Sequence, residues 1–359
     1  MWYIRLMEMG LLPDGLLRLA IRAGLAWGRW QHSRLSAEER HAQKRSLLHK
    51  FDASPVAIHT DDANVQHYEL PSAFFEWVLG PWLKYSCCYW PAGVETLEQA
   101  EEAMLALTCQ RAQIEDGMEV LELGCGWGSL CLWMGQHYPG CRIMAVSNSR
   151  TQKQYIDEQC RQRGLGNVQV ITANVAEWLP EGQFDRVVSV EMFEHMKNYR
   201  LLMARIAQRL RPGGRLFVHI FSHRERAYEF DASDSNNWMA RTFFAGGTMP
   251  SDDLLLHYQQ HLHLVDHWVL DGTHYARTLR AWLDKLDAQK PRVREIMAAT
   301  YGADQATKWL NNWRLFFLAN EMAWGSAGGR EFLVSHYLFE KPGGAFDPAS
   351  AAQQGAPSR

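Results

Sequence analysis

A short segment, Val190-Glu191-Met192-Phe193-Glu194-His195-Met196, brings two carboxylates and an imidazole together. Side chains of these types hold cations and move protons in catalysis, so Glu191, Glu194 and His195 are candidate acid–base groups. Burial and like charge shift the pKa of each group, which makes such a cluster costly beside an apolar strand unless the protein uses it. A structural network around the loop is the alternative. We therefore predict that this segment carries proton-handling chemistry.

A glycine-rich turn lies earlier in the chain, in the segment Glu122-Leu123-Gly124-Cys125-Gly126-Trp127-Gly128. Glycines at alternate positions let the backbone turn sharply and let a ligand approach it without a Cβ in the way. The spacing GxGxG differs from the GxGxxG of dinucleotide enzymes. It matches the first motif of class I methyltransferases, whose loop holds the amino-acid end of S-adenosylmethionine (SAM). Glu122, Gly124 and Gly126 are therefore predicted to contact this cofactor, and a tight turn without a ligand is the alternative.

Polar residues follow the next two apolar runs of the chain. Ser147, Asn148 and Gln152 stand where an enzyme that binds NAD more often has an acid for the ribose. Asn174 and Val175 come after the following run, at a position that faces the adenine in methyltransferases. These residues extend the predicted cofactor site from the ribose to the base.

The elements that must position these groups are short runs rich in β-branched residues. They cover residues 119–123, 142–146, 168–172, 185–190 and 215–220. Helical patterns near residues 127–138, 149–163 and 198–210 alternate with them, which predicts an α/β fold with a parallel, doubly wound sheet. Two more strands are predicted at residues 263–270 and 332–339, separated by a long helical stretch rich in Trp. We expect that stretch to cover the carboxyl edge of the sheet, where such folds bind ligands.

The pattern divides the chain into five regions. They are amphipathic and charged helices plus a linker (1–60), a helical cap (61–116), a SAM-binding Rossmann-like core (117–222), lid helices with the last strands (223–342) and a disordered tail (343–359). From residue 14 to 30, apolar residues and arginines recur at helical spacing. We expect this helix to pack on the domain or on a second subunit, and a helix lying on a lipid surface is the alternative.

The composition excludes several classes of protein. The chain of 359 residues has 37 Lys+Arg and 40 Asp+Glu, so it lacks the basic excess that nucleic-acid binding requires. Its 7 cysteines are odd in number and have no CxxC spacing, so we expect no disulfide framework, no metal site and a reducing compartment. The N-terminal segment lacks a signal-peptide pattern and no apolar run is long enough to span a membrane, which predicts a cytoplasmic protein. The 15 Trp indicate an aromatic pocket or an apolar contact surface.

Longer strings of the sequence resemble the cyclopropane-fatty-acyl-phospholipid synthase family of SAM-dependent enzymes, and within it the plant coclaurine-type N-methyltransferases. The strings are HYELP (67–71), KYSCCYW (84–90), ELGCGWGS (122–129), AVSNS (145–149), VSVEMFEHMKNY (188–199), FVHIFSH (217–223), GGTMPSDDLLL (246–256) and GTHY (272–275). The resemblance implies a class I methyltransferase sheet, parallel with an antiparallel edge strand, preceded by helices and covered by a helical lid. It also implies a homodimer.

The same resemblance implies roles for further residues. Tyr85 and Ser86 join the cofactor contacts. In lipid-modifying members, a bicarbonate ion accepts the proton lost during ring closure, and its ligands correspond to Cys87, Glu194, His219 and Tyr275. In the N-methyltransferase branch, the amine site is lined by residues that correspond to Glu191, Glu194 and His195, with the last two handling the proton. Bacterial lipid synthases usually have glycine at position 191.

One feature departs from the family pattern. Many members carry a cysteine in the late helix at the position of Asn320 or Glu321, whereas this chain has no cysteine after Cys160. A thiol mechanism is therefore excluded, but direct methyl transfer needs none. Aromatic side chains could stabilise a bound cation, and the candidates are Tyr85, Trp238, Phe244, Phe317 and Trp324.

Three functions are compatible with these residues. The first is transfer of a methyl group from SAM to the nitrogen of a hydrophobic, aromatic or cyclic amine. The second is methylation or cyclopropanation of unsaturated acyl chains, with bicarbonate bound. Peripheral membrane contact would accompany this second function, and we do not favour such contact. The third is a scaffold that has lost catalysis, and the intact glycine loop with Glu191, Glu194 and His195 argues against it.

Overall fold

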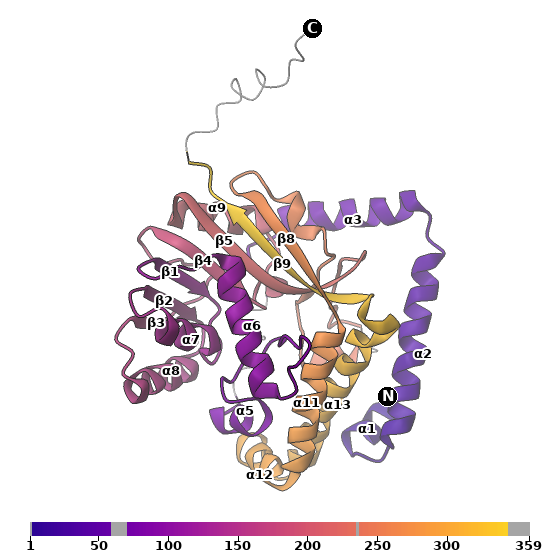
Figure 1. Ribbon diagram of the computed structural model, residues 1–359. Coiled ribbons are helices and arrows are strands. Elements are labelled where there is room, and N and C mark those ends of the chain that lie inside the picture. The colour runs from indigo at the N-terminus through magenta and orange to yellow at the C-terminus, as the bar shows by residue number, and fades with distance from the viewer. Residues whose placement is uncertain (1, 59–69, 235–236, 344–359) are drawn as a thin grey trace.

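The computed structural model describes residues 2–58, 70–234 and 237–343 (Figure 1). Seven strands form one sheet in the order β3-β2-β1-β4-β5-β9-β8. Their bounds are β1 Glu119–Leu123, β2 Arg142–Ser147, β3 Val168–Thr172, β4 Phe184–Val190, β5 Leu210–His223, β8 His263–Asp271 and β9 Phe332–Glu340. Strands β1 to β5 pair in parallel, and β9 runs antiparallel between β5 and β8. The predicted fold class is confirmed, and the antiparallel strand lies one position in from the edge.

Helices precede, separate and follow these strands as the sequence pattern predicts. The α-helices are α1 Trp2–Glu8, α2 Asp14–Ser33, α3 Ala37–Asp52, α5 Ser72–Val78, α6 Leu97–Ala112, α7 Ser129–His137, α8 Arg150–Arg163, α9 Tyr199–Arg209, α10 Trp238–Thr242, α11 Thr273–Ala288, α12 Lys290–Tyr301 and α13 Ala306–Trp324. The smaller elements are β6 Tyr228–Glu229, β7 Thr248–Met249, η1 Phe193–His195, η2 Leu254–His257 and η3 Ser326–Gly329.

Two apolar clusters cover the two faces of the sheet, because successive strand residues point to opposite sides. Val120 and Phe217 pack with α6, α7 and α8 on one face. Leu121 and Val218 pack with α3 and α9 on the other. This burial on both faces explains why the strands appear in the sequence as continuous apolar runs.

A third apolar cluster lies beyond the carboxyl ends of the strands. It joins α5 to α11, α12 and α13, the helical stretch that was predicted between the last two strands. Trp282 and Trp313 are fully buried in it. Figure 1 shows these helices as a layer beside the sheet, with α2 standing next to α13.

The amphipathic helix α2 packs on the domain through one face. Leu17, Ile21 and Leu25 contact the third cluster, and Arg18 Nη2 pairs with Glu321 Oε2 of α13 at 2.7 Å. The predicted packing on the domain is therefore confirmed for this face. None of the helices in the described ranges is long and apolar enough to cross a membrane.

Some sequence predictions lie outside the described residues. The boundary at residue 60, most of the string HYELP and the tail from residue 344 onward belong to them.

Candidate active site

The carboxyl ends of β1, β2 and β4 border two small adjoining cavities. Every predicted cofactor residue lines at least one of them: Tyr85, Ser86, Glu122, Gly124, Gly126, Ser147, Asn148, Gln152, Asn174 and Val175. Gly124, Gly126, Gln152 and Glu191 line both, so the two cavities adjoin along the glycine loop, and together they are called the cofactor pocket after the predicted ligand.

The glycine loop has a backbone that other residues adopt only with strain. Gly124, Gly126 and Gly128 have φ values of +80°, +52° and +84°. A Cβ on Gly124 would lie 2.8 Å from Cγ of Met192, closer than real Cβ contacts. The amides of Gly124 and Cys125 both donate to the carbonyl of Val146 on β2 at 3.0 Å, which holds the turn against the sheet.

Substituting Gly124 by Ala is therefore expected to weaken SAM binding at least about tenfold, since the left-handed backbone costs an alanine about 1–2 kcal/mol and the methyl group meets Met192. The control is Gly164→Ala, at the end of α8, where φ is +67° but no atom lies within 4 Å of the added Cβ. Calorimetric titration with SAM measures the difference. Equal affinity in both variants would contradict the assignment.

Buried polar atoms in this pocket lack partners. Glu122 Oε2, Gln152 Nε2 and Trp127 Nε1 are buried and have no hydrogen-bond partner among the described residues. Burial raises the pKa of Glu122 to about 8. Because buried polar groups are normally paired, these atoms fit a pocket whose ligand completes their bonds. The polar groups present therefore fit SAM, which has amino, carboxylate and ribose groups to offer.

Sequence reasoning missed one charged residue of this pocket. Lys84 is buried, lines the cavity beside Tyr85, and donates from Nζ to Ser86 Oγ and, at 2.9 Å, to the Cys87 carbonyl. Its place in the string KYSCCYW was the available signal.

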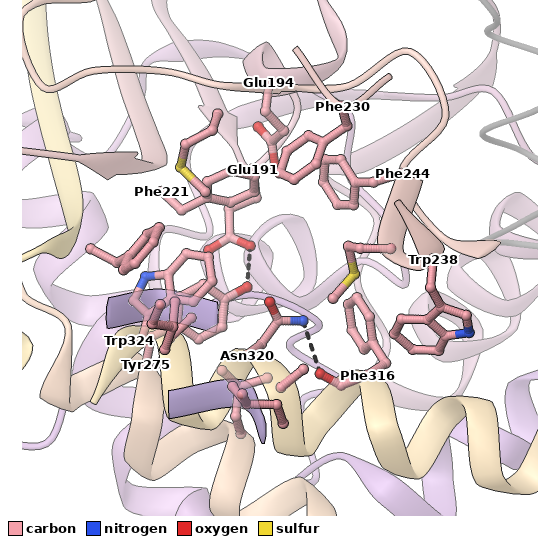
Figure 2. A pocket seen from close by; sticks show the side chains of 18 of the residues that line it. Glu191, Glu194, Phe221, Phe230, Trp238, Phe244, Tyr275, Phe316, Asn320 and Trp324 are labelled. Carbon is pink, nitrogen blue, oxygen red and sulfur yellow. Dashed lines mark hydrogen bonds between the residues drawn. The ribbon is translucent and has the colours of Figure 1, made fainter. Parts of the chain in front are cut away.

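A larger cavity of about 600 Å³ opens beside the cofactor pocket (Figure 2). The two share Tyr85, Glu191 and His195. Four of the five predicted aromatic contacts line the larger cavity: Tyr85, Trp238, Phe244 and Trp324. The fifth candidate, Phe317, is buried against Trp282 and Trp313 in the helical core instead.

The larger cavity draws its walls from distant parts of the chain. Ile21, Gly24 and Leu25 of α2 form part of one wall, and Asn320 of α13 lies across the cavity from Glu191 and Glu194 (Figure 2). Asn320 donates to the Phe316 carbonyl at 2.9 Å, whereas its neighbour Glu321 pairs with Arg18 of α2.

The structure brings Glu191, Glu194 and His195 together where the larger cavity meets the cofactor pocket. Glu191 follows β4 directly, with φ at +45°, the left-handed region that favours glycine. Glu194 and His195 form the short η1 turn, and the ring of His195 stacks on Phe244 with centroids 5.2 Å apart.

The carboxylate of Glu191 receives three hydrogen bonds. The amide of Cys87 donates to Oε1 at 3.0 Å, and the Tyr275 hydroxyl donates to Oε2 at 2.6 Å. His219 Nε2 lies 3.2 Å from Oε1. Three of the four residues predicted as bicarbonate ligands thus bind a side chain of the protein itself. The group set does not fit a bicarbonate ion, because Glu191 occupies its donors.

The predicted place of Cys87 among the bicarbonate ligands is corrected for the same reason. Cys87 reaches Glu191 through its backbone amide, while its Sγ donates to the Cys88 carbonyl at 3.2 Å. Burial raises the pKa of this thiol well above its usual value, so it stays protonated.

Burial sets the charge of the remaining groups. It raises the pKa of Glu194 well above the usual range, and the nearby Glu191 adds to this shift. The Oε2 atom of Glu194 has no hydrogen-bond partner in the described parts of the chain. Burial lowers the pKa of His195 to about 4, so its imidazole is neutral near pH 7.

Comparison with known proteins decides the family. A family model described as mycolic acid cyclopropane synthetase matches residues 57–323. The chain belongs to this family. Within it, the (S)-coclaurine N-methyltransferase of Thalictrum flavum subsp. glaucum is 38% identical over 346 residues, which cover 94% of this chain and 95% of the relative. The cyclopropane-fatty-acyl-phospholipid synthase of Escherichia coli (strain K12) is 31% identical over 230 residues, or 64% of this chain and 57% of that enzyme.

One solved structure agrees with this placement, and a more distant one shares the fold. A coclaurine N-methyltransferase bound to N-methylheliamine and SAH superposes with a TM-score of 0.91 and 37% identity, covering 94% of this chain and 99% of that one. A cyclopropane synthase of Mycobacterium tuberculosis shares the fold, with a TM-score of 0.66, 22% identity and coverage of 80% and 100%. The comparisons confirm the predicted enzyme class, a SAM-dependent methyltransferase on the nitrogen-methylating branch of this family.

Proposed function

We propose that this family member transfers the methyl group of SAM to the nitrogen of a hydrophobic, aromatic or cyclic amine held in the larger cavity. One observation carries the proposal. An aromatic cavity of about 600 Å³ meets the cofactor pocket at two buried acidic side chains, Glu191 and Glu194, and a neutral imidazole, His195. Apolar walls suit a hydrophobic ring system, and acidic groups at the junction suit its ammonium.

The chain's residues have two tasks in this reaction. SAM supplies an activated methyl group, so the enzyme must hold the nucleophile in line with it at near-attack distance. An alkyl amine is protonated near pH 7 and has no lone pair in that state, so the enzyme must also remove a proton. We assign Glu191 as the anchor for the ammonium and Glu194 with His195 as the pair that takes its proton.

The surroundings of each group support this division. Burial raises the pKa of Glu191, and the three hydrogen bonds that its carboxylate accepts oppose this shift and fix its direction. Burial favours the protonated form of Glu194 in the empty site, and its unpartnered buried oxygen can accept a bond from the ammonium, whose charge favours the carboxylate form. His195 is neutral and therefore has a lone pair on one ring nitrogen.

The lipid alternative receives less support. It requires a site for bicarbonate, whereas the groups predicted to bind that ion converge on the Glu191 carboxylate. The test is a methyl-transfer screen with isotope-labelled SAM against amines and against vesicles of unsaturated phospholipid. A panel of secondary amines fused to aromatic rings should yield products labelled on nitrogen. Label in the acyl chains alone would overturn the proposal.

The wall formed by α2 gives a prediction about acceptor size. Gly24 lines the cavity and has no atom within 4 Å of an added Cβ, so Gly24→Leu should place its side chain in the space for the amine. We expect KM for a bulky amine to rise about tenfold or more, and KM for a small cyclic amine to change less. Gly15→Leu is the control, since Gly15 is equally open on α2 but does not line the cavity. Steady-state kinetics with both amines measure these KM values. Equal KM values for the bulky amine in the two variants would contradict the assignment of Gly24 to the cavity wall.

We further propose a cytoplasmic homodimer. The outer face of α2 exposes an apolar stripe of Leu16, Leu19, Trp27 and Trp30, with Leu19 63% exposed and the two Trp rings stacked at 4.7 Å. Contiguous apolar surface of this kind usually marks an interface, and all seven cysteines are free thiols, which suits a reducing compartment. Light scattering should give the dimer mass, and Leu19→Glu should give the monomer mass. A monomeric wild-type enzyme at micromolar concentration would refute the dimer.

A further inference from the structure

A row of side chains crosses the sheet toward the candidate active site. His336 on β9 pairs in register with His219 on β5 and with Trp268 on β8. Arg111, near the end of α6, has Nη1 2.8 Å from His336 Nδ1 and its guanidinium 5.0 Å from the centre of the Trp268 ring. His336 Nε2 lies 2.9 Å from His219 Nδ1, and His219 Nε2 lies 3.2 Å from Glu191 Oε1. Three consecutive hydrogen bonds therefore connect a guanidinium to Glu191.

The guanidinium gives this row a single direction. Arginine has donors and no acceptor, so His336 Nδ1 must accept from Arg111. A neutral imidazole carries one proton, which leaves His336 Nε2 as the donor to His219 Nδ1. By the same reasoning, His219 Nε2 donates to Glu191. Both rings are fully buried, and burial lowers the pKa of each well below its usual value, which keeps them neutral.

We propose that Arg111 and His336 are positioning residues of the active site, which act through His219 to hold Glu191 as an oriented, hydrogen-bonded carboxylate. The proposal rests on the proposed role of Glu191 as the ammonium anchor. The row orients the His219 donor, which joins the Cys87 amide and the Tyr275 hydroxyl on the same carboxylate. Hydrogen bonds in series polarise one another, so the positive charge of Arg111 strengthens the last bond without a cation entering the amine site.

The row does not carry the substrate proton away. Its far end is a guanidinium, which does not give up its proton in proteins. In both histidines, the ring nitrogen on the side of Glu191 already carries a proton and donates it. His219 is therefore a donor to the anchor rather than a base, which corrects its predicted place among bicarbonate ligands. Proton removal stays with Glu194 and His195.

The first test reads the tautomers directly and needs no substrate. In protein labelled with ¹⁵N-histidine, the ring nitrogen shifts of His219 and His336 should show both as Nε2–H tautomers, with His336→Gln used for assignment. Arg111→Met keeps an apolar side chain against Trp268 but removes the donor to Nδ1, so the Nδ1 shift of His336 should move while its Nε2 stays protonated by the bond to His219. A protonated Nδ1 on His336 in the wild type, or no change in Arg111→Met, would overturn the proposal.

The second test separates positioning from general stability. Arg111→Met and His336→Phe should lower kcat for the amine by up to about 10²-fold, because the Glu191 carboxylate is then free to shift slightly and the amine is held less well in line. SAM affinity should stay unchanged. His336→Gln should restore most of the activity, since its amide can accept from Arg111 and donate to His219, as should Arg111→Lys, which keeps a charged donor. Equal loss in the Phe and Gln variants would overturn the positioning role. If no amine is methylated at all, the proposed function fails. The tautomer experiment then still tests the hydrogen-bonded row, because it needs no substrate.

Discussion

Replacing His195 by Ala, or Glu194 by Gln, is expected to slow methyl transfer by about two to four orders of magnitude while SAM binding stays intact. Both residues line the larger cavity, His195 also lines the cofactor pocket, and neither belongs to the glycine loop that is predicted to contact the cofactor. Without the imidazole or the carboxyl group, the bound ammonium keeps its proton and offers no lone pair to the sulfonium methyl. Single-turnover rates with labelled SAM measure the loss, and calorimetry measures cofactor affinity.

The pH dependence of this loss has a defined direction. Burial lowers the pKa of His195 to about 4, so the imidazole of the free enzyme is neutral and able to accept a proton at every higher pH. The difference in methyl-transfer rate between wild type and His195→Ala should therefore persist through the neutral range and narrow only as the pH falls toward about 4. His137→Ala serves as control, since that ring stacks on Trp133 of α7, away from both cavities. Unchanged turnover in both active-site variants would refute the acid–base pair.

Changing Glu191 to Gly is expected to lower the rate of amine methylation by about 10²-fold or more. Added bicarbonate should then raise the residual rate. The substitution relieves a left-handed backbone at φ +45°, which costs other residues about 1–2 kcal/mol. It also frees the three donors from Cys87, His219 and Tyr275, which then form a site for a small planar anion. Because glycine suits this backbone, we expect the variant to fold.

Glu191→Gln is the matched control for bicarbonate. It keeps the side chain among the three donors but removes its charge, so it should lose activity without any response to the ion. Initial rates with and without bicarbonate, together with thermal unfolding of each variant, distinguish these effects. Full activity in Glu191→Gly, or rescue of Glu191→Gln, would show that Glu191 does not take the place of the anion.

Local sequence determined most of the sheet and the residues at its carboxyl edge. The predicted strands at 119–123 and 168–172 coincide with β1 and β3, because strands buried on both faces form apolar runs that stand out from their neighbours. Glu191, Glu194 and His195 could be named together because they are neighbours in the chain. The glycine loop could be named because its backbone angles restrict its composition.

Only the tertiary structure decided how these groups pair and what encloses them. His219 and His336 meet through the register of β5 and β9, which more than a hundred residues of chain separate, and no local pattern encodes that register. The left-handed turn at Glu191 directs its carboxylate into donors that the sequence assigned to bicarbonate. Gly24 lines the larger cavity because α2 packs on α13, a contact between opposite ends of the chain. Sequence thus determined which chemical groups the site has, because local backbone and burial constrain residue types; long-range packing determined which of them touch.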